Sequence, residues 1–271
     1  MKPFIDAFAQ DLSSLRSESP LVLNLTNFVA MDLTANALLA LGASPVMAHA
    51  EEEMRELISA AGAVVINIGT LDPQMVTRMQ LASKLASAAG KPLVLDPVGA
   101  GATTYRTQTA RALLAEHRFA VVRSNASEMA AVFAAPESAG TDAKGVDSVL
   151  DSSAVKDFAL RVSKETECAL WVSGEIDYVL HLGRCVALKN GSPLMAKVTA
   201  MGCTATSLTA AFLAVNPDPF QATFNAAAVM GLCGDEARRR SATPGTFRSA
   251  FVDALAQVES SWASRLEVVF S

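Results

Sequence analysis

Asp96 stands at the end of a short apolar run and opens a glycine-rich turn. The run PLVLDP at residues 92–97 reads as a buried strand, and Gly99 and Gly101 follow it directly. Ligands of open α/β sheets collect at the carboxyl ends of parallel strands, so this aspartate is a candidate for binding a metal ion or a phosphate. A strand-ending Asp-Pro turn with glycines for tight geometry explains the stretch equally well, because a bare GxG pair is a weak motif.

The sequence RSNASE at residues 123–128 brings a second acid to the end of the next predicted strand. Asn125 and Glu128 have the spacing of a capping box, and an acid is favourable at any helix start, so the stretch taken alone favours this structural role. In a binding site, Glu128 would hold Mg²⁺ through water, and the planar guanidinium of Arg123 would pair with phosphate oxygens.

Two further stretches supply hydroxyl, thiol and backbone N–H groups. Ser173 lies in the turn VSGEIDY at residues 172–178, which can contact a nucleotide but more often only reverses the chain. AMGC at residues 200–203 opens an aliphatic helix, whose start binds anions and favours a thiolate. Cys203 can equally pack as a small hydrophobic residue. The helix end lowers the pKa of its thiol and a nearby phosphate raises it, so the sign of the net shift stays open.

The elements that would position these residues alternate along the chain. Short β-branched runs are followed by alanine-rich helical segments, the pattern of parallel strands covered by helices. The first four runs are apolar without alternation, as in strands buried on both faces, whereas the later runs are closely spaced and predict antiparallel hairpins. We therefore predict an α/β fold with a mainly parallel central sheet, helices on both faces and an antiparallel edge. The predicted strands are residues 22–26, 63–69, 92–97, 119–125, 168–174, 178–183 and 184–191.

Local signals mark the ends of several helices. Gly42 ends a helical stretch that starts at residue 32, and Asp72 with Pro73 starts the helix after the second strand. Ser124 or Asn125 caps the short helix after the fourth strand. The helices are therefore expected to begin where the strands turn back, next to the candidate site residues.

Composition argues against several classes of protein. The 271-residue chain has 51% hydrophobic and 18% charged residues, far from a disordered composition. A net charge of −5 without a basic cluster argues against nucleic acid as a partner. The N-terminal stretch lacks the apolar core of a signal peptide, and the uncharged stretch 198–217 is too rich in threonine and serine for a membrane span. Four cysteines without a CxxC pair indicate a reducing, cytoplasmic setting.

The chain reads as one domain over residues 1–271. No repeat or linker-like composition divides it, and residues 136–153 are its most loop-like stretch. The high apolar fraction suggests that part of the surface is covered in an oligomer, although the many alanines weaken this argument.

The joint occurrence of candidate metal ligands, a cationic group and an anion-binding helix start matches what phosphoryl transfer needs. The stretch NLTNFVAMDLTANALLALGASPVMAHAEEEM at residues 24–54, followed in order by LDPVGAGAT, VRSNASE, SGEIDYV and VTAMGCTAT, resembles the hydroxyethylthiazole kinases of thiamine salvage, which have a ribokinase-like fold. The resemblance covers most of the chain. It implies transfer of the γ-phosphoryl group of ATP, with Mg²⁺, to the hydroxyl of 4-methyl-5-(2-hydroxyethyl)thiazole. It also implies a homotrimer with the thiazole site between subunits.

The resemblance assigns roles to residues of one site. Where related ribokinase-like enzymes carry Gly-x-Gly-Asp, with the aspartate as base, this chain has Ala200 and Cys203; the alanine narrows the space beside the substrate, and the thiol serves as a positioner and at most a modest base. Ser173 replaces the threonine of many relatives and keeps the hydroxyl. The implied roles are thiazole binding by Asn27, Met47 and Ala200, magnesium binding by Asp96 and Glu128, ATP binding by Arg123 and Ser173, and an anion hole facing the substrate hydroxyl at Gly202 and Cys203.

Three alternatives share this fold. A hydroxymethylpyrimidine or pyridoxal kinase would use the same nucleotide elements with another pocket, and the stretch around Met47 argues for thiazole. A nucleotide-dependent dehydratase that repairs hydrated NAD(P)H normally carries the aspartate at the helix start, so Cys203 disfavours it. A non-catalytic ligand-binding protein would not require metal-binding acids, so intact Asp96, Arg123 and Glu128 weigh against it.

Overall fold

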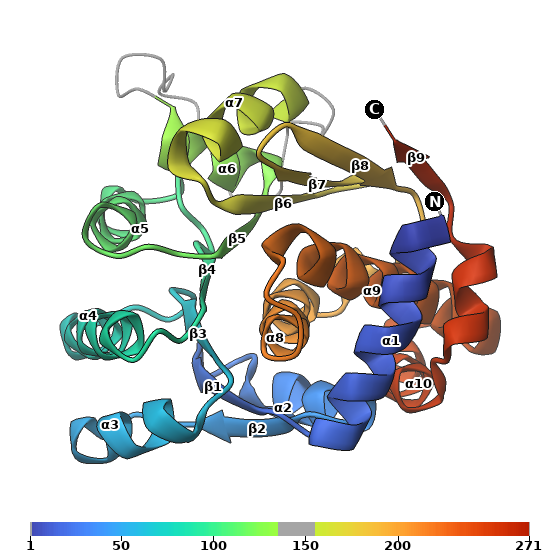
Figure 1. The fold of residues 1–271 in the computed structure, drawn as a ribbon, viewed down its shortest axis with the longest axis horizontal. Helices are drawn as coiled ribbons and strands as arrows, with labels where there is room; N and C mark the ends of the chain where they lie inside the picture. Colours follow the sequence, from blue (N-terminus) through green and yellow to red (C-terminus); the bar gives the residue numbers. More distant parts are fainter. Residues whose placement is uncertain (1, 135–154, 271) are drawn as a thin grey trace.

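The computed structural model describes residues 2–134 and 155–270, so the loop-like stretch 136–153 lies outside it. The strands of this part form one nine-stranded sheet in the order β2-β1-β3-β4-β5-β6-β7-β8-β9 (Figure 1). The strands are β1 (Leu21–Leu25), β2 (Ser44–Met47), β3 (Ala63–Asn67), β4 (Leu93–Asp96), β5 (Val121–Asn125), β6 (Ala169–Ser173), β7 (Asp177–His181), β8 (Arg184–Leu188) and β9 (Val268–Phe270). The helices are α1 (Lys2–Glu18), α2 (Met31–Leu41), α3 (Glu51–Ala60), α4 (Pro73–Ala88), α5 (Thr104–Glu116), α6 (Ala126–Phe133), α7 (Lys156–Thr166), α8 (Met201–Leu213), α9 (Pro219–Arg240) and α10 (Pro244–Gln257), with short 3₁₀ turns η3 (Met195–Lys197) and η4 (Ser260–Arg265).

Strand pairing confirms the predicted sheet. Parallel pairs run from β2 through β1, β3, β4 and β5 to β6, and antiparallel pairs join β6 to β7, β7 to β8 and β8 to β9. The strands from β2 to β6 in this order therefore run in the same direction, and the direction alternates from β6 to β9. The sequence prediction missed both edge strands. β2 contains Pro45, which an edge strand tolerates and a central strand does not, and β9 has only three residues.

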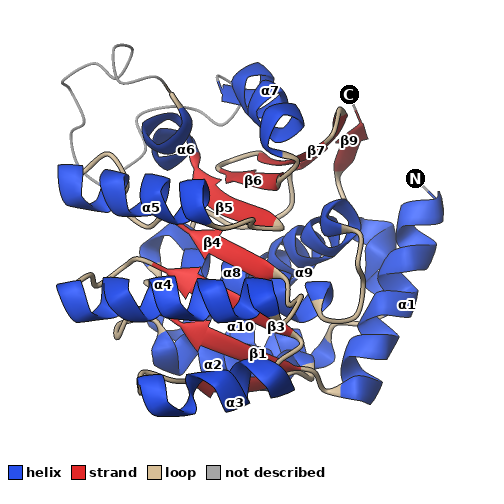
Figure 2. Cartoon of the chain, turned by 60° about the vertical axis from the view of Figure 1, so that its left-hand side comes forward, coloured by secondary structure: helices blue, strands red, loops and turns tan. Residues whose placement is uncertain are grey.

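Helices cover both faces of the sheet, as predicted. The helices α1, α2, α8, α9 and α10 pack on one face, and α3 to α7 pack on the other; Figure 2 shows α3, α4 and α5 side by side across the second face. Within β4, Val94 belongs to the first core cluster, whereas Leu93 and Leu95 belong to the second. Successive side chains of a strand point to opposite faces, so only an uninterrupted apolar run can fill both cores.

The predicted helix signals act as expected. Gly42 ends α2 with φ of 113°, a left-handed conformation that glycine adopts without strain. Asp72 caps α4 by accepting a hydrogen bond from the Met75 N–H (2.7 Å). Asn125, rather than Ser124, caps α6. Asp72 and Asn125 start helices shortly after β3 and β5, at the carboxyl edge of the sheet, whereas Gly42 ends α2 before β2.

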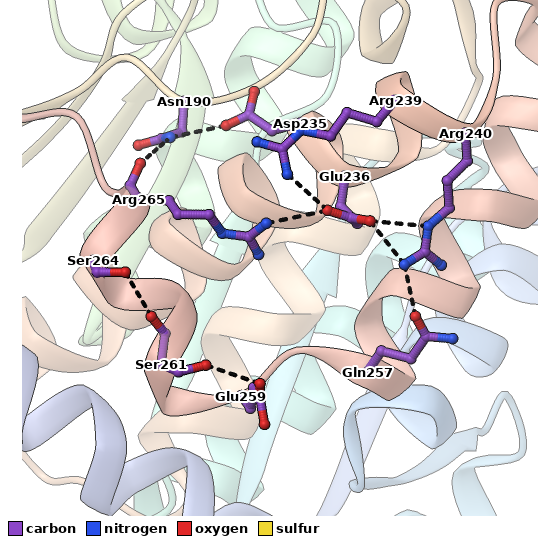
Figure 3. Close-up of polar contacts among 10 residues, drawn as sticks. All are labelled: Asn190, Asp235, Glu236, Arg239, Arg240, Gln257, Glu259, Ser261, Ser264 and Arg265. Carbon is purple, nitrogen blue, oxygen red and sulfur yellow. Dashed lines mark hydrogen bonds and ion pairs between the residues drawn. The ribbon is translucent and has the colours of Figure 1, made fainter.

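The C-terminal turn η4 is fastened to α9 by an ionic cluster (Figure 3). Glu236 of α9 accepts hydrogen bonds from Arg265 Nη1 (3.1 Å), Arg239 Nη1 (3.0 Å) and Arg240 Nη2 (2.9 Å). The cluster lies at the end of α9, and η4 continues from it into the edge strand β9.

Among the helices of the described residues, none is both long enough and apolar enough to cross a membrane.

Candidate active site

The carboxyl ends of the parallel strands bring polar side chains to one edge of the sheet. Asn67 at the end of β3 is in register with Asp96 at the end of β4. Asn125 at the end of β5 is in register with Ser173 at the end of β6. The strands β3, β4 and β6 are apolar up to these last residues, because the earlier ones fill the two cores, whereas β5 also carries Arg123 and Ser124.

A cavity of about 330 Å³ lies at this edge, between the strand ends and the start of α8. It gathers most of the residues that the resemblance assigned to the site, although Met47 and Ser173 are not part of its wall. The predicted residues that line it are Asn27, Asp96, Arg123, Glu128, Ala200, Gly202 and Cys203.

Asp96 is fully buried at the floor of this cavity. Its Oδ2 accepts hydrogen bonds from Asn67 Nδ2 and from Thr206 Oγ1, each at 2.8 Å, whereas Oδ1 has no hydrogen-bond partner among the described residues. Burial raises the pKa of the Asp96 carboxyl to about 7, against the lowering effect of the nearby Arg123 guanidinium. A cation bound at the free oxygen would offset this desolvation and favour the charged form.

Glu128 has both carboxylate oxygens bound to backbone N–H groups. Oε2 accepts from Asn125 N (2.9 Å) and completes a capping box with Asn125 Oδ1, which accepts from Glu128 N (2.8 Å). Oε1 accepts from Gly99 N (2.8 Å), in the turn that follows β4. The capping role that the sequence favoured is therefore present, and the same side chain ties this turn to the start of α6.

Asp96 and Glu128 suit a magnesium ion that is held partly by substrate and water, rather than a metal ion held by protein side chains alone. The described residues contain no group of three or more His, Cys, Asp or Glu side chains that could hold a metal ion. Mg²⁺ is commonly bound by one or two carboxylates together with substrate phosphates and water. Asp96 offers an unpartnered oxygen for this purpose, whereas Glu128 has only its remaining lone pairs to offer.

Arg123 extends from β5 toward the start of α8. Its Nη2 donates to Ser173 Oγ (2.6 Å), and its Cζ lies 5.8 Å from the ring centre of Trp171. Its Nε is buried without a hydrogen-bond partner in the described part of the chain. Ser173 therefore holds the guanidinium rather than lining the cavity itself. A planar cation held in this way can pair with the oxygens of a phosphate.

The start of α8 has the geometry of an anion site. Its first backbone hydrogen bond runs from Thr204 N to Ala200 O (2.8 Å), so the N–H groups of Met201, Gly202 and Cys203 precede the helical ladder. Ala200 has φ of 71°, in the left-handed region, which glycine adopts without strain and alanine does not.

Cys203 is a neutral thiol in the protein as it stands. Its Sγ accepts a hydrogen bond from Asn27 Nδ2 (3.2 Å). Burial and the nearby Asp96 carboxylate raise the pKa of the thiol to about 11, although hydrogen bonds from Asn67 and Asn27 and the charge of Arg123 oppose the shift. Without a bound phosphate the pKa of the Cys203 thiol is therefore shifted upward, because desolvation outweighs the opposing hydrogen bonds and the charge of Arg123.

Met47 is not part of the cavity wall. It ends the edge strand β2, where it is in register with Asn24 of β1. Its side chain is half-buried. A contact between Met47 and a bound thiazole would therefore involve the outer edge of the sheet.

Sequence reasoning missed three residues that organise the cavity. Asn67 and Thr206 bind Asp96, and the guanidinium of Arg106 donates to the carbonyl oxygens of Ile68 (3.1 Å), Val98 (2.7 Å) and Gly69 (2.5 Å). Arg106 thus joins the loops after β3 and β4. The one available signal was the polar Asn67 at the end of the apolar run AVVIN, at the same strand end as Asp96 in the next run.

The fold is that of the ribokinase-like proteins. A ribokinase-like superfamily protein from Enterococcus faecalis V583 superposes with a TM-score of 0.64 at 14% identity, covering 90% of this chain and 89% of the other. The chain belongs to the hydroxyethylthiazole kinase family, whose sequence profile matches residues 12–261.

Individual members of this family match over nearly their whole length. The hydroxyethylthiazole kinase of Leptospira biflexa is 46% identical over 91% of this chain and 91% of its own. The structure of the hydroxyethylthiazole kinase protein from Pyrococcus horikoshii OT3 superposes with a TM-score of 0.86 at 38% identity and covers both chains completely. The family predicted from the motifs is therefore confirmed.

Proposed function

We propose that this chain transfers the γ-phosphoryl group of ATP to the hydroxyl of 4-methyl-5-(2-hydroxyethyl)thiazole. Membership of the hydroxyethylthiazole kinase family supports this activity and makes ATP the co-substrate. The observation that carries the proposal is that one cavity contains Asp96, Arg123 and the free N–H groups at the start of α8. These groups come from three separate segments, and each is suited to one part of a nucleotide triphosphate.

The residues of the chain act mainly by orientation and charge. Phosphoryl transfer passes through a loose transition state, so it depends more on alignment and charge neutralisation than on a strong base. The N–H groups of Gly202 and Cys203 would stabilise charge on the transferred group, and Arg123 would pair with the phosphates. A thiol with a raised pKa can donate or accept a hydrogen bond at the substrate hydroxyl, which suits Cys203 as a positioning group.

Mg²⁺ is part of the proposal. It would be held by Asp96, with Glu128 contributing through water, and when bound it would neutralise charge on the phosphates. The unpartnered Oδ1 of Asp96 is the structural support for this role. The contacts of Glu128 with Gly99 and Asn125 mean that its removal would also loosen the turn after β4.

The proposal includes a homotrimer with the thiazole site between subunits. Phe28 and Val29, which follow β1 beside the cavity, have exposed fractions of 60% and 61%. Exposed apolar side chains at the rim of a site are suited to contact with another subunit. Met47 at the nearby sheet edge would then contribute to a site that one chain leaves incomplete. Sedimentation equilibrium of the purified protein would test the trimer directly.

The domain organisation and the cellular location of the protein are predicted from the sequence alone. The predicted organisation is that residues 1–271 act as a single domain. The predicted location is cytoplasmic, for which the free state of all four cysteines is support, since reducing compartments keep thiols free.

The activity is tested by ATP consumption with thiazole, hydroxymethylpyrimidine and pyridoxine alcohols, each with and without Mg²⁺. We expect magnesium-dependent turnover that is highest with the thiazole alcohol. Asp96→Ala should lower this turnover by about 100-fold, in the range for removing one stabilising group from a transition state, while Cys203→Asp should retain most of it. Preferred turnover of another alcohol, or the reverse ranking of the two variants, would contradict the proposal.

A further inference from the structure

Asn67 and Thr206 both donate to the same oxygen of Asp96, and no role has been given to either side chain. We propose that they are positioning residues of the kinase site, which hold the Asp96 carboxylate so that Oδ2 is occupied and Oδ1 is kept for the magnesium–nucleotide complex. This proposal rests on the proposed function for the identity of that ligand. The arrangement of the two donors is observed independently of that function.

The orientation of the Asn67 amide follows from its neighbours. The backbone N–H of Gly69 can only donate, and it lies 3.0 Å from Asn67 Oδ1. The other end of the amide, Nδ2, therefore faces Asp96 Oδ2 at 2.8 Å and must donate to it. A side chain fixed in this way presents a donor, and not an acceptor, to Asp96.

The chain of amides continues to the thiol. The N–H of Ala30 donates to Asn27 Oδ1 (3.0 Å), so Asn27 Nδ2 must face Asn67 Oδ1 (2.9 Å) and Cys203 Sγ (3.2 Å). The donors run from Asn27 to Asn67 to Asp96, and Asn27 also donates to Cys203 Sγ. The two amides thereby link the carboxylate to the thiol.

Thr206 reaches Asp96 from α8, one turn into the helix. Its Oγ1 lies 2.8 Å from Asp96 Oδ2 and 3.2 Å from the carbonyl oxygen of Gly202. The hydroxyl carries a single proton, which the carboxylate oxygen attracts more strongly than a carbonyl does. Thr206 thus joins the anion-binding start of α8 to the carboxylate, so the two cannot move independently.

Because the Asp96 carboxylate is buried, its orientation depends on the two protein donors and not on water. Asn67 is 1% exposed, and Asp96 and Thr206 are fully buried, so solvent does not readily replace a lost donor. The two oxygens of a carboxylate are chemically equivalent, and only its donors distinguish them. With two donors on Oδ2 and none on Oδ1, the side chain cannot turn over without losing both bonds.

The decisive comparison uses three variants of α8. Thr206→Val removes the hydroxyl at constant shape, Thr206→Ser keeps it, and Thr209→Val makes the same change at a fully buried threonine whose hydroxyl bonds Ala205 O within the helix (2.9 Å). Supporting contacts of metal ligands are typically worth about 10- to 100-fold in affinity or activity. We expect Thr206→Val to lower kcat and raise the half-activating Mg²⁺ concentration by about tenfold or more, with the KM for the thiazole alcohol unchanged.

Rescue by serine separates positioning from packing. Thr206→Ser should stay within about threefold of the wild type in kcat, and Thr209→Val should leave both kcat and the Mg²⁺ requirement near wild type. Asn67→Asp, which replaces the donor to Asp96 by a second carboxylate, should reproduce the defect of Thr206→Val. Equal behaviour of Thr206→Val and Thr209→Val, or failure of serine to restore activity, would overturn the proposal.

A second readout does not depend on the acceptor. Thermal unfolding with and without Mg²⁺ and the non-hydrolysable ATP analogue AMP-PCP should show a ligand-induced rise in Tm for the wild type and Thr209→Val, and a much smaller one for Thr206→Val. If the wild type shows this rise but does not phosphorylate the thiazole, the proposed function fails and the positioning role stands. If the wild type shows no rise, or all variants show the same rise, the positioning role fails.

Discussion

Gly202 and Arg123 occupy adjoining space at the start of α8. A Cβ atom built on Gly202 would overlap Nη1 of Arg123 and lie 3.1 Å from its Cζ. The guanidinium therefore reaches the anion site only because position 202 has no side chain. This contact gives Gly202, the glycine of the AMGC stretch, a steric reason that is independent of backbone conformation.

Gly202→Ala should displace the Arg123 guanidinium. Alanine favours a helix by about 1 kcal/mol over glycine, so the fold should persist while the KM for ATP rises by about tenfold or more. Steady-state kinetics with varied ATP measures the effect. Gly245→Ala is the matched control, because a Cβ at that position in α10 meets nothing within 4 Å. An unchanged KM for ATP in Gly202→Ala would show that the guanidinium does not depend on this space.

Ala200→Gly should stabilise the protein. Ala200 has φ of 71° and ψ of 2°, a conformation that costs alanine about 1–2 kcal/mol, and glycine would remove this cost. Glycine also gives the unfolded chain more conformational entropy, which offsets about 0.4–1 kcal/mol of the gain in stability. We expect the free energy of unfolding in urea to rise by about 0.5–1 kcal/mol. Ala89→Gly is the control, because Ala89 has φ of −89° and ψ of 1°, so the same change should destabilise. Equal effects of the two variants would contradict the assignment of strain to position 200.

The buried Asp96 carboxyl should make the free protein less stable as the pH rises. Its pKa of about 7 in the folded state exceeds the ordinary value of 3.8, so the unfolded chain releases this proton first and the free energy of unfolding falls between pH 4 and 7. Asp96→Asn does not titrate. Its stability relative to the wild type should therefore increase by on the order of 2–4 kcal/mol from pH 4 to pH 8, measured by urea unfolding without Mg²⁺ or nucleotide. A constant difference over this range would contradict the raised pKa.

The Cys203 thiol should react slowly with iodoacetamide. It is the partly exposed member of the four cysteines, and the pKa of its thiol is raised to about 11. Since the thiolate is the reacting species, the labelling rate at pH 8 should be at least about tenfold below that of a free cysteine and should rise steeply above pH 9. Mass spectrometry of the labelled protein follows the reaction, and Cys203→Ser identifies the labelled site.

The same neutral thiol predicts the activity of Cys203→Ser. A hydroxyl replaces one neutral hydrogen-bonding group by another, so kcat should remain within about tenfold of the wild type. A loss of about 1000-fold, together with fast labelling at pH 8, would instead indicate a catalytic thiolate.

The Glu236 cluster should contribute to stability at neutral pH. Burial raises the pKa of Glu236, but hydrogen bonds from Arg240 and Arg265 outweigh it and leave the pKa below its ordinary value of 4.5. Its contribution is therefore present above pH 4.5 and is lost as the pH falls through the folded pKa. Glu236→Gln should lower the free energy of unfolding by about 1–2 kcal/mol at pH 7, and by less below pH 4.

Glu259→Gln provides the control for this cluster. Glu259 is exposed and accepts a hydrogen bond from Ser261 Oγ (2.9 Å; Figure 3), so its replacement should change the free energy of unfolding by less than about 0.5 kcal/mol. If Glu236→Gln lowers the free energy of unfolding at pH 7 no more than Glu259→Gln does, the ionic cluster does not stabilise the protein. The attachment of η4 would then depend on apolar packing alone.

Much of the fold was predictable because its signals are local. The central strands are uninterrupted apolar runs that fill two cores, as Leu93, Val94 and Leu95 do, and each such run is visible within a few residues. Gly42 and Asp72 mark helix ends through contacts within one turn. The edge strand β2 escaped prediction because its stability comes from pairing with β1, about twenty residues away in the chain, and not from its own sequence.

The sequence by itself determined the central strands, several helix ends and the motifs that identify the family, since each depends on neighbours along the chain. Only the tertiary structure decided which oxygen of Asp96 is free, that Glu128 is bound on both oxygens, and that the pKa of Cys203 rises. These properties depend on burial and on hydrogen bonds between distant residues, such as Asp96 with Thr206 and Asn27 with Cys203. Local patterns carry no record of such contacts, because folding creates them when the strand ends and the start of α8 meet.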